Sequence, residues 1–255
     1  MKQKKLRKNF SGIPKSHPRY NSLNTRSLIA EGVKKKVTSM DGLIAHGRGE
    51  AFDYLLGEKT NQCAKKAIEA ASAMIILAKH PVISVNGNSA MLSAKEIAEM
   101  SEASGAAVEV NIFHASVQRE KRIKNHLIRN GAKKVLLPDK KFAIKYLESN
   151  RRFVNPEGIL KADVVFVPLE DGDRAEALIK NRKNVVTIDL NPLSRTARKS
   201  TVTIVDNITR AAPLLCKKII ELKNKDKKTL LKIIKNYDNK KNLSESLNYM
   251  RKNLP

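Results

Sequence analysis

The spacing of apolar residues changes near residue 80, and this change divides the chain into two kinds of predicted structure. Before that point the apolar side chains recur at helical spacing. This spacing predicts helices over residues 20–37, 50–56 and 60–79. A glycine-rich segment, residues 41–49, separates the first two helices and is expected to be a loop.

Beyond residue 80, short apolar runs that predict strands alternate with amphipathic segments that predict helices. The first of these helices begins with the capping pattern of Ser93 and Glu96 and ends at Gly105, and the second ends at Gly131. The predicted strands are residues 82–85, 108–113, 134–137, 163–167, 185–190 and 202–205. Because these strands are almost wholly apolar, the fold class is α/β, with a parallel sheet covered by helices on both faces.

The two ends of the chain add helices to this sheet. Residues 1–12 are basic and aperiodic and are expected to form a flexible extension. Residues 13–255 are expected to fold as a single α/β domain, with a helical segment over 13–80 and C-terminal helices over 209–255. No apolar segment follows the basic N-terminus and no run is long enough to cross a bilayer, so we expect a cytoplasmic protein without a membrane partner.

The chain is strongly basic, with 50 Lys and Arg against 25 Asp and Glu and a net charge of +25, which attracts polyanions. The excess is spread in lysine pairs, aromatic residues make up 4% and tryptophan is absent, so few side chains could stack on nucleic-acid bases. A solvated lysine-rich surface is therefore favoured, a site for small anions comes second, and RNA or DNA binding comes third. Cys63 and Cys216 are too few for a disulfide framework and fit a reducing compartment.

Candidate chemistry lies in the loops after the strands, because the carboxyl ends of parallel strands share one edge of the sheet. No Walker-type GxxxxGK sequence and no GxGxxG joins a strand to a helix, which disfavours a P-loop enzyme or an ordinary dinucleotide-binding protein. After residues 185–190, Asn191 suits a helix cap, and Ser194 and Arg195 would lie in the first turn, where free N–H groups favour a phosphate. The alternative is an ordinary capped helix with an exposed arginine.

Two other strand ends carry acidic side chains. Asp206 and Asn207 follow the last strand and allow the same two interpretations. Glu170, Asp171 and Asp173 follow residues 163–167, and three acids together could hold Mg²⁺ beside a nucleotide. A purely structural capping role is the alternative for Asp173.

Two segments near the N-terminus combine basic residues with turn-forming residues. His46 and Arg48 lie in the sequence His-Gly-Arg-Gly, where the glycines would let a ligand approach the backbone closely. A lone histidine such as His46 more often has a structural role. Lys15 and Arg19 lie in a proline-rich basic segment that could simply be a turn entering a helix.

Taken in order, these segments resemble a known family. The chain contains the strings PKSHPRY, GLIAHGRGEAFDYLLGE, PVISVNGN, ADVVFVPLEDGDR, TIDLNPLSRTA and TIVDNI. They closely resemble the archaeal phosphopantothenate synthetase family, the 4-phosphopantoate–β-alanine ligases. The resemblance runs from about Ile13 to the last helices and is looser over residues 116–160 and in the lysine-rich tail.

The resemblance implies a Rossmann-like fold, a homodimer, and a ligase of coenzyme A synthesis that uses ATP and Mg²⁺. The implied reaction joins 4-phosphopantoate and β-alanine to give 4-phosphopantothenate, AMP and pyrophosphate through an acyl-adenylate. The ATP contacts that it implies fall on Arg26, Arg48, Asp189, Leu190, Asn191, Ser194, Arg195, Asp206 and Asn207.

Roles within this set follow from the charge that develops on phosphate during the reaction. Arg48 and Arg195 are expected to stabilise that charge and are the catalytic candidates. The phosphate of 4-phosphopantoate is expected to bind Lys15, Arg19, His46 or Arg174. The metal ligands stay unassigned, and nucleic acid is not expected as a functional partner. The rival hypotheses are a basic RNA-binding protein without catalytic activity and a ligase that forms an acyl-phosphate and releases ADP.

Overall fold

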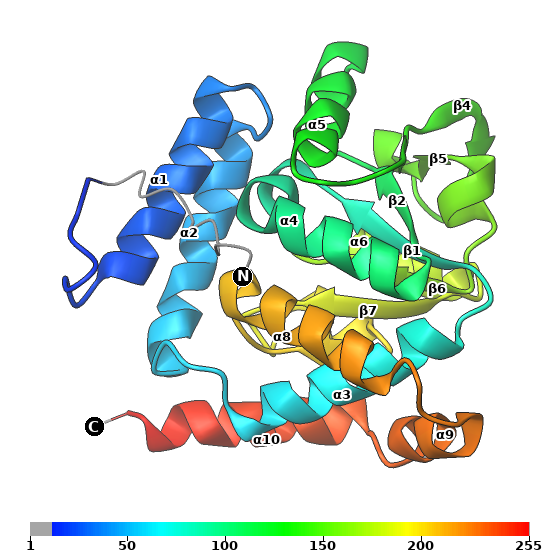
Figure 1. The fold of residues 1–255 in the computed structure, drawn as a ribbon. Coiled ribbons are helices and arrows are strands. Elements are labelled where there is room, and N and C mark those ends of the chain that lie inside the picture. Colours follow the sequence, from blue (N-terminus) through cyan, green and yellow to red (C-terminus); the bar gives the residue numbers. More distant parts are fainter. Residues whose placement is uncertain (1–11, 255) are drawn as a thin grey trace, which may run out of the picture.

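A computed structural model describes residues 12–254, and a six-stranded parallel sheet lies at its centre (Figure 1). The strands are β1 (Pro81–Val85), β2 (Ala107–Val110), β3 (Val135–Leu136), β6 (Val164–Phe166), β7 (Asn184–Ile188) and β8 (Val202–Ile204). Their order in the sheet is β3-β2-β1-β6-β7-β8, and every neighbouring pair is parallel. This is the Rossmann-like strand order, in which the direction of winding reverses between β1 and β6.

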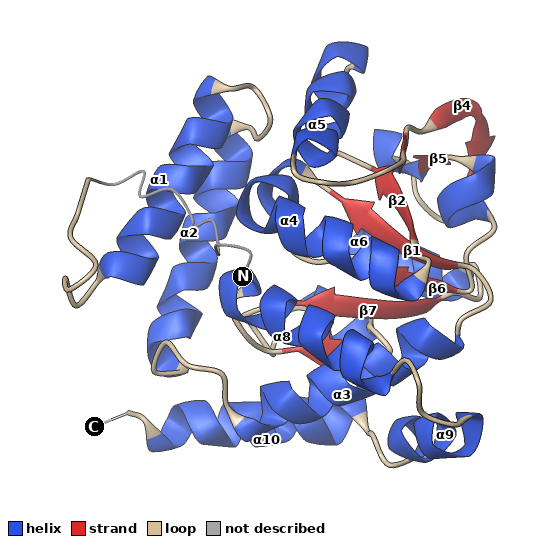
Figure 2. Cartoon of the chain, viewed as in Figure 1, coloured by secondary structure: helices blue, strands red, loops and turns tan. Residues whose placement is uncertain are grey.

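Helices cover both faces of the sheet and extend it at both ends of the chain (Figure 2). The helices are α1 (Tyr20–Lys34), α2 (Met40–Leu55), α3 (Gln62–Leu77), α4 (Gly87–Ser104), α5 (Val117–Arg129), α6 (Gly172–Lys180), α7 (Arg195–Lys199), α8 (Ile208–Leu222), α9 (Lys227–Lys235) and α10 (Asn239–Lys252). A small antiparallel pair, β4 (Asp139–Ala143) and β5 (Phe153–Val154), with short helical turns at Asn150–Arg152 and Pro156–Leu160, occupies a stretch for which the sequence predicted no regular structure. Within residues 12–254 no helix is long and apolar enough to cross a membrane.

The alternation of side chains along each strand builds two separate cores. Ile83 and Val85 of β1 pack with α3, α4 and α8, whereas Val82 packs with α6 and the β4–β5 pair. The same division holds in β6, where Val164 and Val165 face opposite sides. Both faces of the sheet are therefore buried, as the almost wholly apolar strands predicted.

Helix α2 is the main difference from the sequence prediction. The segment 41–49 is not a loop, because α2 continues through all of its glycines from Met40 to Leu55. Ser39 caps the helix by accepting a hydrogen bond from the Gly42 N–H at 3.2 Å. A Cβ atom on Gly42 would lie 2.8 Å from the amide oxygen of Asn88, so this glycine serves close packing rather than a turn. Tertiary contacts here outweigh the low helix propensity of glycine.

Two helix starts also differ from the predictions. Helix α4 begins at Gly87 and is capped by Asn86, whereas the predicted starting residue, Ser93, lies at a kink inside it. Helix α7 begins at Arg195 and is capped by Ser194 rather than by Asn191. The helix start predicted at Asn207 is confirmed, because Asn207 caps α8, which continues through Pro213. The extension predicted over residues 1–12 lies, apart from Gly12, outside the described residues.

Candidate active site

The loops after β1 and β6 are tied together at the point where the strand order reverses. Asn86 follows β1, and its amide nitrogen donates hydrogen bonds to the carbonyl oxygens of Pro168 (3.2 Å) and Leu169 (2.9 Å). Open α/β sheets bind ligands in the crevice at this reversal. Helices α1 and α2 lie beyond these carboxyl ends of the strands (Figure 1), and residues of α2 border the cavities found there.

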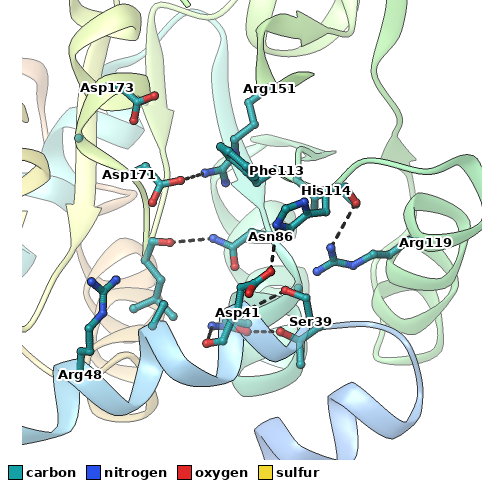
Figure 3. A pocket seen from close by; sticks show the side chains of 18 of the residues that line it. Ser39, Asp41, Arg48, Asn86, Phe113, His114, Arg119, Arg151, Asp171 and Asp173 are labelled. Carbon is teal, nitrogen blue, oxygen red and sulfur yellow. Dashed lines mark hydrogen bonds and ion pairs between the residues drawn. The ribbon is translucent and has the colours of Figure 1, made fainter. Parts of the chain in front are cut away.

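Two adjoining cavities occupy this crevice. The first has a volume of about 550 Å³ and lies between α2, the start of α4 and the loop after β2. The second has a volume of about 430 Å³ and lies between α2 and the loop after β7. Seven residues line both cavities and form the wall that the two share: Ala45, Arg48, Asn88, Leu169, Asp171, Gly172 and Arg195. Figure 3 shows Arg48 rising from α2 into this region, with Asp171 and Arg151 above it in the view.

Hydrogen bonds within the loop itself preform the second cavity. Asp189 accepts hydrogen bonds from the Asn191 N–H, at 2.9 Å, and from the Ser194 hydroxyl. The Asn191 side chain accepts a hydrogen bond from the Leu193 N–H, and Ser194 accepts one from the Ala197 N–H, each at 2.9 Å. Burial raises the pKa of Asp189 above its ordinary value, while the Ser194 hydrogen bond opposes the shift. The loop is thus fixed around one partly buried carboxyl group.

A neighbouring carboxylate holds Arg195 at the mouth of both cavities. Glu176 accepts hydrogen bonds from Nε (3.2 Å) and from one terminal nitrogen (2.6 Å) of Arg195. The Arg195 hydrogen bond is the largest cause that lowers the pKa of Glu176 to about 2, and the pKa of Arg195 is raised in turn. Within residues 12–254 no hydrogen bond or ion pair engages the Arg48 side chain. The shared wall therefore presents one oriented and one unengaged arginine.

The first cavity is bordered by contacts between α2, α5 and the loop after β2. His114 and Asp41 approach within 3.0 Å and connect this loop to the start of α2. Arg119 donates hydrogen bonds to the carbonyl oxygens of Val37 and His114, both at 3.3 Å. Burial, followed by the charge of Arg151, lowers the pKa of Arg119.

An ion-pair cluster that includes the predicted substrate residue Arg174 lies behind the first cavity. The Glu170 carboxylate, whose side chain is 0% exposed, pairs with both Arg151 and Arg174. Arg174 also donates a hydrogen bond to the Ser84 hydroxyl at 3.1 Å, and its side chain is fully buried. Arg151 additionally bonds Asp171 at 2.8 Å. Arg174 is enclosed and paired, lines neither cavity and braces the loop after β6, and its expected contact with a substrate phosphate stays a prediction.

The structure places the other predicted substrate residues at different distances from the crevice. His46 lines the second cavity, and burial lowers the pKa of its imidazole. Lys15 and Arg19 are exposed in the turns before α1 and line neither cavity. Their expected contact with a substrate phosphate stays a prediction.

Arg26, Asp206 and Asn207 bind α2 or its neighbours, and their expected contact with the nucleotide stays a prediction. Arg26 donates a hydrogen bond to Glu50 of α2 at 2.9 Å. Asn207 donates to Asp53 of α2 at 2.9 Å, and the buried Asp206 accepts hydrogen bonds from Thr60 at 2.6 Å and from Arg210. Burial raises the pKa of Asp206, and Arg210 opposes the shift. None of the three lines either cavity, but Arg26 and Asn207 hold the helix that carries Arg48.

Sequence reasoning missed three polar residues of the site. Asn86 directly follows the predicted strand over residues 82–85, so the expectation that binding residues follow the strands applies to it as well. Arg119 and Arg151 come from the stretch where the family resemblance is loose, and only the fold brings them to the crevice. No pattern in the sequence around them signals this position.

The acidic side chains offer partial support for a metal ion. Within residues 12–254 no group of three or more His, Cys, Asp or Glu side chains is placed to hold a metal ion by itself. Glu170 is engaged by two arginines, but Asp171 and Asp173 both line the first cavity. Mg²⁺ commonly takes one or two carboxylates together with substrate phosphates, so these two residues fit a metal that arrives with a nucleotide.

The strand order defines a Rossmann-like α/β protein, with two adjoining cavities at the winding reversal. Residues 63–253 match the family described as phosphopantothenate/pantothenate synthetase. The chain belongs to this family.

Individual relatives cover nearly the whole chain. A 4-phosphopantoate–β-alanine ligase from Thermococcus kodakarensis is 51% identical over 245 residues, which are 95% of this chain and 93% of the relative. A protein of the same name from Methanosarcina mazei is 48% identical over 245 residues, 96% of each chain. A third, from Methanospirillum hungatei, is 50% identical over 210 residues, 82% of this chain and 86% of the relative. These relatives come from archaea, as the resemblance implied.

Proposed function

We propose that this protein is an ATP-dependent ligase of coenzyme A synthesis that joins 4-phosphopantoate and β-alanine to give 4-phosphopantothenate, AMP and pyrophosphate. The observation that carries the proposal is the pair of adjoining cavities at the winding reversal, with Arg48 and Arg195 on their shared wall. The names of relatives at about 50% identity over most of the chain support the substrates.

The second cavity is assigned to the nucleotide. It is bordered by Asp189, Leu190, Asn191 and Ser194, whose loop is fixed by its own hydrogen bonds before any ligand binds. A preformed loop lowers the entropy cost of ordering the site around ATP. The first cavity is then left for the acid substrate, and the shared wall is the place where the two would react.

Arg26, Asp206 and Asn207 enter this proposal through helix α2. Arg26 bonds Glu50 and Asn207 bonds Asp53, and both acceptors lie on the helix that carries Arg48. Asp206 bonds Arg210, which itself pairs with Asp53. These contacts would keep Arg48 facing the nucleotide phosphates.

The chemistry requires activation of a carboxylate, because oxide is too poor a leaving group for direct attack by an amine. A carboxylate oxygen of 4-phosphopantoate attacks the α-phosphorus of ATP. The bond between the α-phosphorus and the oxygen that bridges it to the β-phosphorus breaks, and pyrophosphate leaves. The β-alanine amine then attacks the acyl carbon, the bond to the AMP oxygen breaks, and the amine loses a proton. Arg48 and Arg195 would stabilise the charge that develops on phosphate at the shared wall.

Mg²⁺ is part of the proposal, with Asp171 and Asp173 as the residues that would hold it. When bound, the ion would neutralise negative charge on the nucleotide phosphates. Asp171 already bonds Arg151, and burial raises the pKa of Asp171 above its ordinary value. A neighbouring cation would lower that pKa and keep the carboxylate charged.

A homodimer in the cytoplasm completes the proposal. Met40 and Ile44 lie on one side of α2 with 60% and 64% of their surfaces exposed, which suits an interface between two copies. Cys63 and Cys216 are unpaired and buried, which fits a reducing compartment. Light scattering after gel filtration tests the dimer, and a mass of 28.5 kDa, that of one chain, would exclude it.

Product analysis tests the reaction. The protein is incubated with ATP, Mg²⁺, 4-phosphopantoate and β-alanine, and the products are identified by chromatography and mass spectrometry. We expect 4-phosphopantothenate and AMP in equal amounts, and neither product when 4-phosphopantoate is omitted. Formation of 4-phosphopantothenate with ADP and phosphate would preserve the ligase but reject the adenylate. Absence of 4-phosphopantothenate would reject the ligase.

A further inference from the structure

Leu169 has a backbone conformation that is unusual for a branched side chain. Its φ is +58°, in the left-handed region that glycine adopts freely and that a Cβ atom disfavours. The residue follows β6 and borders both cavities of the crevice. Strained backbone persists only where the surrounding structure enforces it, and such residues gather at functional sites.

The other residues with this conformation lie in different surroundings. Within residues 12–254 four further non-glycine residues have a positive φ, and all four are exposed and line neither cavity: Lys36, Glu58, Tyr146 and Arg182. Three of them follow the ends of helices, where the left-handed conformation is common. Leu169 is half-buried and follows a strand, so the end of a helix does not account for its conformation.

Hydrogen bonds on both sides of Leu169 enforce the conformation. Its N–H donates to the carbonyl oxygen of Ile188 on β7 at 3.1 Å, and its own carbonyl oxygen accepts from the Asn86 amide at 2.9 Å. The same amide donates to the carbonyl oxygen of Pro168 at 3.2 Å. The next residue, Glu170, is fixed by the ion-pair cluster behind the first cavity. The backbone of Leu169 is therefore held from before and after.

The wall that the two cavities share is otherwise polar or small. Of its seven residues four have polar side chains, and the apolar ones besides Leu169 are Ala45 and Gly172. Leu169 packs partly against the main core of the sheet. Among the described residues of this wall it thus has the one large apolar side chain, at the place where the acid and the nucleotide would react.

The acid substrate carries an apolar group that fits this wall. In 4-phosphopantoate the carbon atom with two methyl groups lies two bonds from the carboxyl carbon. When the carboxylate lies beside Arg48 and Arg195, the methyl groups lie close to the same wall. Ile112 and Phe113 border only the first cavity, whereas Leu169 borders the wall itself.

We infer that Leu169 is a specificity-determining residue, held in the left-handed conformation so that it packs against the methyl groups of the acid substrate. This inference rests on the proposed ligase function. A glycine at this position would relieve the strain but would leave the methyl groups without this apolar contact.

The test compares 4-phosphopantoate with 2,4-dihydroxybutanoate 4-phosphate, the same acid without its two methyl groups. We expect the wild type to prefer 4-phosphopantoate in kcat/KM by roughly 10- to 100-fold, the range for small apolar groups in an apolar pocket. Leu169→Gly should lose roughly 10-fold in kcat/KM for 4-phosphopantoate and less than about twofold for the methyl-free acid. The KM for ATP should stay within about twofold of the wild type. Leu169→Met keeps the apolar volume and should keep most of the preference.

Leu169→Ala separates the side chain from the backbone conformation. Alanine and glycine both lack the apolar contact, so both variants should lose the same preference, but alanine keeps the strain. Leu169→Gly should therefore melt roughly 2–4 °C above Leu169→Ala. Arg182→Gly is the matched control, because Arg182 has a φ of +60°, is exposed and lines neither cavity. It should raise the melting temperature and leave every kinetic constant unchanged.

The outcomes distinguish this inference from the ligase function. If the wild type makes 4-phosphopantothenate and the glycine and alanine variants of Leu169 keep the preference for the methylated acid, the inference is overturned and the ligase stands. An equal loss for both acids would give Leu169 a structural role alone and would also overturn it. Loss of the preference in Phe113→Ala, with its retention in Leu169→Gly, would place the methyl groups elsewhere in the first cavity and would equally overturn it.

Binding measurements decide the inference even when the ligase fails. If the wild type binds the two acids without turnover, calorimetry gives the ratio of their dissociation constants. A ratio that falls in Leu169→Gly supports the inference, and a ratio that stays at the wild-type value overturns it.

Discussion

Replacing Arg195 with alanine separates the chemistry of the site from its packing. The side chain lies at the first position of α7 and is 58% exposed. Its Nε and one terminal nitrogen bond Glu176, and the second terminal nitrogen has no partner in the described chain. That nitrogen is the donor available to a phosphate at the shared wall, and Glu176 fixes its direction.

The expected loss follows from the number of contacts that disappear. Removing one oriented donor to charge that develops in a transition state costs roughly 100- to 1,000-fold in turnover. Stability should change little, because the Arg195 side chain is 58% exposed and its hydrogen-bond partner within residues 12–254 is the Glu176 carboxylate, and ion pairs at such exposed positions contribute little. Glu176→Gln should lower turnover less than Arg195→Ala, because the arginine remains but its direction is no longer fixed.

Turnover at saturating ATP and thermal melting, measured on the same preparations, test this reasoning. Arg198→Ala is the matched control, because Arg198 is an exposed arginine on the same short helix that lines neither cavity. The reasoning is refuted if Arg195→Ala turns over at a near-normal rate, or if its loss of turnover is matched by an equal loss in Arg198→Ala.

Three further predictions concern other parts of the molecule. Arg48→Ala should also lose roughly 100- to 1,000-fold in turnover and stay folded, since the side chain has no hydrogen-bond or ion-pair partner within residues 12–254. Turnover near the wild-type value would contradict its role. Burial raises the pKa of Glu109, on β2, from 4.5 to about 7. The wild type should therefore lose about 3 kcal/mol of stability relative to Glu109→Gln as the pH rises through this interval. If urea unfolding at pH 5 and at pH 8 gives the same difference in stability between the two proteins, the shift is refuted. Replacing four exposed lysines of the tail with glutamine should weaken RNA retention and its salt dependence while ligase turnover stays close to normal. These lysines are Lys227, Lys228, Lys240 and Lys241. A parallel loss of RNA retention and ligase turnover would place the tail in the active site.

The sheet could be predicted from the sequence because its strands are apolar on both faces. The predicted strand over residues 82–85 matches β1 within one residue, and the predicted stop at Gly105 is confirmed by its left-handed conformation, with φ of +74°. These signals are local, since a buried strand and a glycine stop each depend on a few neighbouring residues.

Helix α2 could not be predicted in the same way. The glycines of residues 41–49 indicate a loop by propensity, but packing against Asn88 and the cap at Ser39 stabilise a helix instead. Arg48 therefore reaches the crevice from a helix that lies across the strand ends, not from a glycine loop.

The site could be predicted only where it follows a strand along the chain. The Asp189–Ser194 loop borders the second cavity as its position after β7 suggested. Arg119 and Arg151 arrive from α5 and from a short turn before β5, and their meeting depends on how these elements pack. Position after a strand does not by itself place a side chain in the site. Arg174 follows β6 along the chain, but its side chain is buried and paired with Glu170.

The most direct measurement follows an oxygen atom from the acid into the nucleotide product. 4-Phosphopantoate labelled with oxygen-18 in its carboxylate is converted with ATP and β-alanine, and the nucleotide and phosphate products are analysed by mass spectrometry. The proposed mechanism predicts one labelled oxygen in the phosphate of AMP and none in pyrophosphate, because the carboxylate attacks the α-phosphorus and the acyl carbon–oxygen bond then breaks. Label in inorganic phosphate, released together with ADP, would contradict it.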